Sequence, residues 1–121
     1  MSAIGFKNLK VLKGMFTLPW HPQLIKLLMW LVVRVSKDKI TITSAYRKGD
    51  KGVHGTVPLR AFDIRSKSFD SPESICLDVN KTWTYDPARP EKTVALYHQS
   101  VDKNGKSKGW HIHLQVHNDT K

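Results

Sequence analysis

The apolar positions of two segments recur at the spacing of an α-helix. In the first segment, the repeat begins after Pro22, a residue that the first turn of a helix tolerates, and it continues to Val35. In the second, Ser71 is suited to cap a helix that begins at Pro72 and ends near Trp83. We therefore predict two helices, and the first should pack against the core through Leu24, Leu27, Leu28, Leu31 and Val35.

Four other segments have the alternation or the β-branched content of strands. They are residues 39–44, 60–65, 93–98 and 110–117, separated by loops at 48–58, 86–90 and 102–109. Residues 1–20 form a basic lead-in for which the pattern predicts no element. The order of helix, strands, helix, strands is typical of an α+β fold with a mainly antiparallel sheet and helices packed on one side. With 121 residues, the chain fits a single domain over residues 1–121.

The strand predicted at 110–117 presents two chemically different faces, because successive side chains of a strand point to opposite sides. Every second residue from Trp110 to Val116 is apolar, so this face is expected to pack on the core. The other face carries His111, His113, Gln115 and His117. Two imidazoles two positions apart suit zinc binding, or one binds the ion while the other transfers a proton. A solvent-facing strand that happens to carry histidines is the alternative.

Asp63 is the candidate carboxylate. It stands between Phe62 and Ile64, which are expected to face the core, so Asp63 should lie on the other side of its strand. A carboxylate there needs a partner, because burial of an unpaired charge is costly. The partner is either a salt bridge from Arg60 or Arg65, or a metal ion.

His54, in the glycine-rich loop, could return to the same point as Asp63. Zinc accepts histidine nitrogen and carboxylate oxygen together, and catalytic zinc sites use three protein ligands and a water molecule. His54, Asp63 and one histidine of the last strand would make such a set. Arg47 follows a strand and could hold a substrate carboxylate or an oxyanion, and the alternative is a surface arginine of a basic protein.

These residues lie in short motifs that together resemble those of the D-alanyl-D-alanine carboxypeptidase and L-alanyl-D-glutamate endopeptidase family. The family includes many phage endolysins and is part of the lysostaphin-like metallopeptidase group. The resemblance implies a zinc cleft on the face opposite the helices, with Zn2+ bound by His54, Asp63 and His113, and with Arg47 stabilising the tetrahedral intermediate. The implied function is hydrolysis of a peptide bond in the stem or cross-link peptide of bacterial peptidoglycan. The motifs are Ser44-Ala-Tyr-Arg47, His54-Gly, Arg60-Ala-Phe-Asp63-Ile and His111-Ile-His113-Leu-Gln, and the resemblance runs from about Pro22 to His117.

Two departures from the family's pattern affect the expected mechanism. The gap from His54 to Asp63 is nine positions, two more than the family usually has. Trp110 stands where the family often has an acidic general base, and tryptophan cannot accept a proton. His111 is then the first candidate for the base and His98 the second, and His111 instead of His113 could be the metal ligand.

Two other functions are alternatives to the peptidase. A net charge of +10 favours attraction to polyanions, so the main alternative is a non-catalytic module that binds nucleic acid or an anionic cell-wall polymer. The four tryptophans are scattered, however, and no aromatic-basic stripe indicates a specific nucleic-acid partner. The other alternative is a cysteine hydrolase. The single cysteine, Cys76, lies between Ile75 and Leu77 in a predicted helix, which favours a buried thiol over a nucleophile.

No segment has the features of a signal peptide or of a transmembrane helix. The most apolar run, residues 24–33, contains Lys26 and is too short to span a bilayer. We therefore expect a monomer that is made soluble in the cytoplasm and acts on the cell wall after release.

Overall fold

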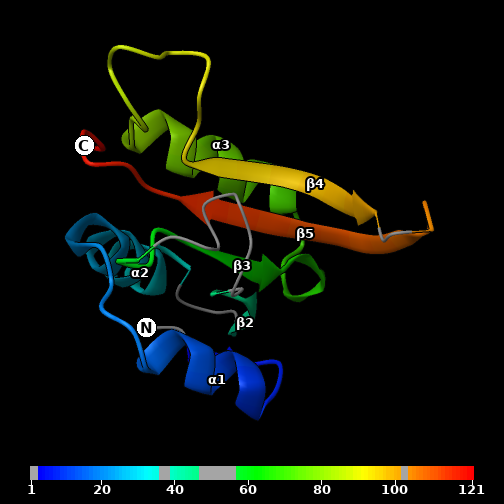
Figure 1. The fold of residues 1–121 in the computed structure, drawn as a ribbon. Helices are drawn as coiled ribbons and strands as arrows, with labels where there is room; N and C mark the ends of the chain where they lie inside the picture. Colours follow the sequence, from blue (N-terminus) through cyan, green and yellow to red (C-terminus); the bar gives the residue numbers. More distant parts are fainter. Residues whose placement is uncertain (1–2, 36–38, 47–56, 102–103) are drawn as a thin grey trace.

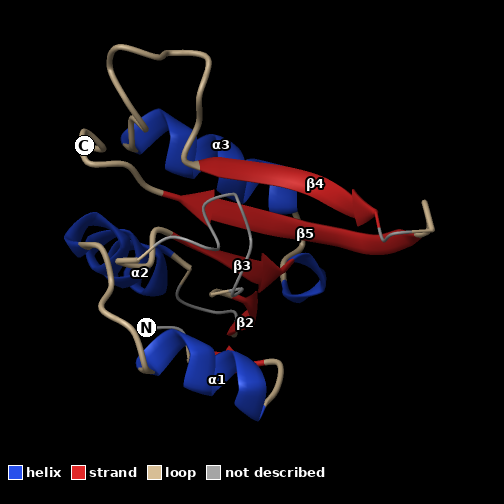
Figure 2. Cartoon of the chain, in the orientation of Figure 1, coloured by secondary structure: helices blue, strands red, loops and turns tan. Residues whose placement is uncertain are grey.

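The computed structural model describes residues 3–35, 39–46, 57–101 and 104–121. In this part of the chain, three α-helices and a five-stranded sheet form one α+β domain (Figures 1 and 2). The helices are α1 (Leu9–Phe16), α2 (Pro22–Arg34) and α3 (Pro72–Thr82). The strands are β1 (Ile4–Phe6), β2 (Ile40–Ser44), β3 (Ala61–Arg65), β4 (Ala95–Val101) and β5 (Ser107–Gln115), and a 3-10 turn, η2 (Ser66–Ser68), follows β3.

The strand order across the sheet is β1-β2-β3-β5-β4. β1 pairs in parallel with β2, and the other three neighbouring pairs are antiparallel. The predicted α+β class and mainly antiparallel sheet are therefore confirmed. Because β3 pairs with β5, the strand with the candidate carboxylate lies directly beside the strand with the candidate histidines.

Helices α2 and α3 begin where the sequence predicts. Pro22 takes the first position of α2, and the side chain of His21 accepts a hydrogen bond from the backbone N–H of Gln23. Ser71 caps α3 by accepting from the backbone N–H of Ser74. Both helices lie behind the sheet in the view of Figure 1. None of the helices in the described ranges is long and apolar enough to cross a membrane.

The core lies between the sheet and these two helices. Ile112 and Leu114 of β5 and Phe62 and Ile64 of β3 have no exposed surface, and neither does Leu27 of α2. Residues that alternate with the buried ones point to the other face of the sheet. The alternation in the sequence therefore predicted correctly which face of β3 and β5 packs on the core.

Residues 1–20 contain two elements that the hydrophobic pattern did not predict. Strand β1 pairs with β2 at the edge of the sheet, and α1 packs against both strands. The helix begins after Asn8, whose side chain accepts a hydrogen bond from the backbone N–H of Val11. It has only eight residues and fully buries only Met15, so its apolar repeat is too short to stand out in the sequence.

The hairpin formed by β4 and β5 is longer than predicted at the end where the two strands are connected. β5 starts three residues before Trp110, while it stops at Gln115. Trp110 was expected in the core, and that prediction is wrong: its side chain is 53% exposed and packs on the ring of Tyr97, with 4.9 Å between the ring centroids. The end of the hairpin where β4 runs into β5 extends beyond α2 and α3 (Figure 2). Trp110 belongs to the half of β5 nearer this end, where it pairs with Gln99 of β4.

We predict that Leu27→Ala lowers the free energy of unfolding by about 2–5 kcal/mol, because a fully buried leucine of α2 is replaced by a cavity. The matched control is Leu77→Ala, the same change in α3 at a position that is 70% exposed, which should cost no more than about 0.5 kcal/mol. Urea denaturation of the two variants gives both values. Equal losses would contradict the packing of α2 against the sheet.

Candidate metal centre

Asp63 and His113 form a cross-strand pair in the middle of the sheet. They stand directly opposite each other on the antiparallel strands β3 and β5, so their side chains meet on the face that the core does not use. His113 Nδ1 lies 2.8 Å from Asp63 Oδ1, and the two residues are only 8% and 6% exposed. Arg60, one of the expected salt-bridge partners, donates to the carbonyl oxygen of Val116. The imidazole is therefore a polar partner for this buried carboxylate.

The amide of Gln115 determines which nitrogen of His113 carries a proton. Gln115 Nε2 donates to the carbonyl oxygen of Thr93 at 2.9 Å, which leaves its Oε1 facing His113 Nε2 at 3.1 Å. Since an amide oxygen only accepts, His113 donates from Nε2. In the neutral ring, Nδ1 then has the lone pair, and it faces Asp63 Oδ1. Two electron-pair donors this close need a cation between them, either a proton or a metal ion.

His111 and His98 extend this site along the same face. They are opposite each other in the β4–β5 pairing, with their ring centroids 4.4 Å apart. His111 Nε2 lies 3.8 Å from Asp63 Oδ2, which is too long for a hydrogen bond. Partial burial lowers the pKa of His111 from its ordinary value of 6.5, and the nearby charge of Asp63 acts in the opposite direction. His111 is therefore mainly neutral at neutral pH and able to accept a proton.

The structure brings four of the six predicted site residues together: Asp63, His98, His111 and His113. The other two, Arg47 and His54, lie outside the described residues. Two of the three expected metal ligands are thus adjacent, and the third stays a prediction. Gln115 was assigned to the right face by the sequence, but its bond to Thr93 depends on tertiary structure and has no sequence signal.

A second group of ligand atoms lies past the end of β5. Asp86, His117 and Asp119 each offer one atom, all within 4.8 Å of one another, and this group could hold a metal ion. The sequence predicted His117 on the same strand face as the other histidines. β5 ends at Gln115, however, and His117 Nδ1 instead lies 4.0 Å from an oxygen of Asp86. Asp86 and His117 are far apart in the sequence and share no motif, so only the folded chain shows this group.

The carboxylate of Asp86 already has two hydrogen-bond donors. One oxygen accepts from Arg89 Nε at 2.7 Å, and the other accepts from the backbone N–H of Ala88 at 3.0 Å. Asp119 is exposed, and the distance from its Oδ2 to His117 Nδ1 is 3.8 Å. A metal ion at this position would have to compete with the guanidinium of Arg89 for Asp86.

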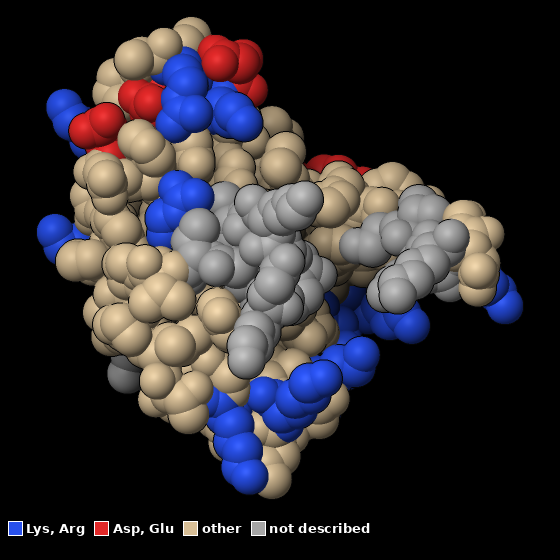
Figure 3. Space-filling model, viewed as in Figure 1, with Lys and Arg blue, Asp and Glu red and all other residues tan. Residues whose placement is uncertain are grey.

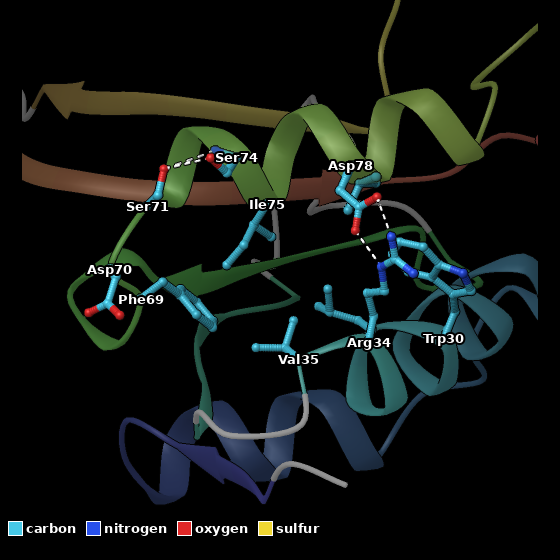
Figure 4. Close-up of a pocket in the computed structure, with 11 residues that line it drawn as sticks. Trp30, Arg34, Val35, Phe69, Asp70, Ser71, Ser74, Ile75 and Asp78 are labelled. Atoms are coloured by element: carbon cyan, nitrogen blue, oxygen red, sulfur yellow. Dashed lines mark hydrogen bonds and ion pairs between the residues drawn. The ribbon is translucent and has the colours of Figure 1, made fainter.

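A cavity of about 440 Å³ lies on the other side of the sheet, between α2 and α3 (Figure 4). Trp30 and Arg34 line it from α2, and the guanidinium of Arg34 makes two hydrogen bonds to Asp78 of α3, at 2.6 and 3.0 Å. The residues that line it include neither Asp63 nor His113. A substrate of the candidate metal centre would therefore bind on the opposite face of the sheet from this cavity.

We predict that Cys76 reacts slowly with iodoacetamide in the folded protein. Burial raises the pKa of its thiol to about 11, and the charge of Glu73 adds to this shift. Because the thiolate is the reactive form, on the order of one thiol in a thousand is reactive at about pH 8. Mass spectrometry should show fast modification only after unfolding in denaturant. Fast modification of the folded protein would favour the cysteine hydrolase instead.

We also predict that Arg89→Gln weakens the fold mainly near neutral pH. The guanidinium of Arg89, with the N–H of Ala88, holds the pKa of Asp86 below its ordinary value of 3.8. A lowered folded-state pKa stabilises the fold above the unfolded value, and this stabilisation is lost as the pH falls through the lowered pKa. The difference in Tm between wild type and variant should narrow as the pH falls from about 7 to about 3. A constant difference would show that Arg89 acts through packing and not through charge.

Comparison with known proteins finds no relative of this chain. No protein-family model, no curated protein and no solved structure matches it. Inference of its function therefore depends on its own residues and their geometry.

Proposed function

We propose that the protein is a zinc-dependent peptidase that hydrolyses a peptide bond in bacterial peptidoglycan. One observation carries the metal-binding part of this proposal. His113 Nδ1 lies 2.8 Å from an oxygen of Asp63, while the other ring nitrogen faces the amide oxygen of Gln115. A catalytic zinc ion takes three protein ligands at about 2.0–2.2 Å, and Asp63 and His113 would supply two of them. His54 is the proposed third.

The donor atoms and their neighbours suit zinc. Imidazole nitrogen together with carboxylate oxygen is a zinc ligand set, whereas magnesium and calcium prefer oxygen alone. Histidine ligands of metals usually donate their other N–H to an outer partner that fixes the orientation of the ring, and Gln115 is such a partner for His113. When bound, the ion supplies a Lewis acid that polarises the scissile carbonyl and lowers the pKa of a water molecule.

The proton transfers are assigned to residues of the chain. His111 is proposed as the general base, because it is neutral, lies beside Asp63 and is on the same face of the sheet. It would take the proton of the attacking water and return it to the leaving amine. His98, in ring contact with His111, is the alternative base. Arg47 is proposed to stabilise the oxyanion of the tetrahedral intermediate.

The substrate class is inferred from the resemblance of the motifs to peptidoglycan peptidases. Two further features support it. The net charge of +10 favours approach to the anionic polymers of a bacterial cell wall. The face that carries Asp63 and His113 is also not the one that α2 and α3 cover, so a polymeric substrate would not have to displace these helices.

We predict that Asp63→Ala, His113→Ala and His54→Ala each abolish hydrolysis of peptidoglycan and lower the bound zinc, because each removes one of three ligands. Gln115→Leu should keep the ligands but weaken zinc affinity by about 10- to 100-fold, since His113 loses the partner that orients its ring. Elemental analysis gives the zinc content, and mass spectrometry of the released peptides gives the activity.

The matched control is His117→Ala, which removes an imidazole from the second ligand group and should leave zinc and activity unchanged. Loss of zinc in this variant but not in His113→Ala would place the metal at Asp86 and overturn the proposal. Full activity in a zinc-free variant would overturn it as well. A zinc-free, inactive wild type that binds DNA in a salt-dependent manner would favour the basic binding module.

A further inference from the structure

Helix α1 presents apolar side chains to solvent on one side. Leu9 and Phe16 are 60% and 63% exposed. They are seven positions apart, which is about two helical turns, so they point in the same direction. Leu12 lies between them and is half-buried. Met15 is fully buried and anchors the helix to the rest of the protein. The exposed apolar side chains are thus held in place by a helix that is itself packed.

Two aromatic rings continue this apolar surface away from the helix. The ring of Phe16 meets the ring of Phe6 from β1 at 5.8 Å and that of Trp20 at 5.6 Å. The indole N–H of Trp20 donates to the carbonyl oxygen of Met15, which fixes the ring against the end of α1. We call the surface formed by Leu9, Leu12, Phe16, Phe6 and Trp20 the α1 face.

The charged residues of α1 and of the residue range just before it are all basic. Lys7, Lys10 and Lys13 are exposed on or beside the helix. The first acidic residue of the chain is Asp38, so residues 1–37 contain six lysines and arginines and no carboxylate side chain. On the face visible in Figure 3, the lower end, where α1 lies in Figure 1, shows basic but no acidic side chains, whereas the upper part shows both.

We propose that the α1 face binds the surface of an anionic lipid bilayer. Apolar and aromatic side chains beside lysines are the features of helices that lie in the plane of a membrane surface. A nucleic acid would neutralise the lysines but would leave Leu9 and Leu12 without an apolar partner. A second copy of the chain would bring the same lysines together and be repelled. An anionic bilayer satisfies both the apolar and the charged side chains.

The expected contribution of each side chain to the affinity for vesicles follows from its apolar area or its charge. Burial of one exposed leucine or phenylalanine in the acyl boundary should strengthen binding by about tenfold. Each lysine near an anionic surface should contribute about fivefold. Because the lysines act through charge, binding should weaken as salt shortens the range of the attraction. This proposal does not depend on zinc or on hydrolysis.

The test is flotation of the full-length protein with vesicles of phosphatidylcholine, with or without phosphatidylglycerol. We expect the protein to float with the anionic vesicles and not with the neutral ones. Leu9→Ser should weaken this binding by about tenfold, and the double variant Lys10→Glu/Lys13→Glu by at least about 25-fold. Phe16→Ser should weaken binding to the same extent as Leu9→Ser. Leu9→Ser is the preferred variant, because the ring of Phe16 packs on two other rings and its loss could also disturb the fold.

The matched control is Leu77→Ser, which changes a leucine of α3 that is 70% exposed and lies near Glu73 and Asp78. It should bind the anionic vesicles as wild type does, and circular dichroism should show that every variant is folded. Failure of the wild type to float with anionic vesicles would overturn the proposal. So would equal binding by wild type, Leu9→Ser and the double lysine variant, or a dimer in sedimentation that Leu9→Ser dissociates.

Discussion

The contact between Asp63 and His113 depends on the register of two strands. In the antiparallel pairing of β3 with β5, these residues are direct partners, and a slip by one residue would send one of them into the core. The carboxylate is almost completely buried and lies against the imidazole, whose other ring nitrogen faces the amide oxygen of Gln115. The proposed ligands, the neighbouring His111 and the mechanism built on them all follow from this register.

The two faces of the sheet have different roles: one forms the core, and the other carries the candidate metal centre. One face packs Phe62, Ile64, Ile112 and Leu114 under α2 and α3, and these side chains set the position of the strands. The residues that alternate with them are directed to the other face, where imidazole and carboxylate groups collect. The cavity between α2 and α3 is on the core side and is separated from these groups by the sheet itself (Figure 4). The proposed chemistry is therefore supported by a packed core and does not weaken it.

The uneven distribution of charge adds a second feature to the molecule. All ten carboxylate side chains lie from Asp38 onward, and the basic lead-in, residues 1–20, folds into β1 and α1. An unfolded basic segment would attract anionic surfaces through its charge but would not hold its apolar side chains in a defined arrangement. Folded as a helix with Met15 buried, it displays Leu9 and Phe16 beside lysines in a fixed arrangement. The folded helix therefore combines apolar and basic side chains on one surface, as binding to an anionic bilayer requires.

Local periodicity alone determined much of this fold. The 3.6-residue repeat, with Pro22 at the first helical position and Ser71 as a cap, predicts α2 and α3. The two-residue alternation predicts which side of β5 carries the histidines. Both patterns are properties of residues close together in the sequence. Only the tertiary structure decided that Trp110 is exposed, that His117 leaves the strand to meet Asp86, and that α1 forms at all. It also decided that Asp63 faces His113 and that Gln115 orients the ring. These outcomes depend on which strands pair and on where the helices cease to cover the sheet, and such long-range packing has no periodicity along the chain.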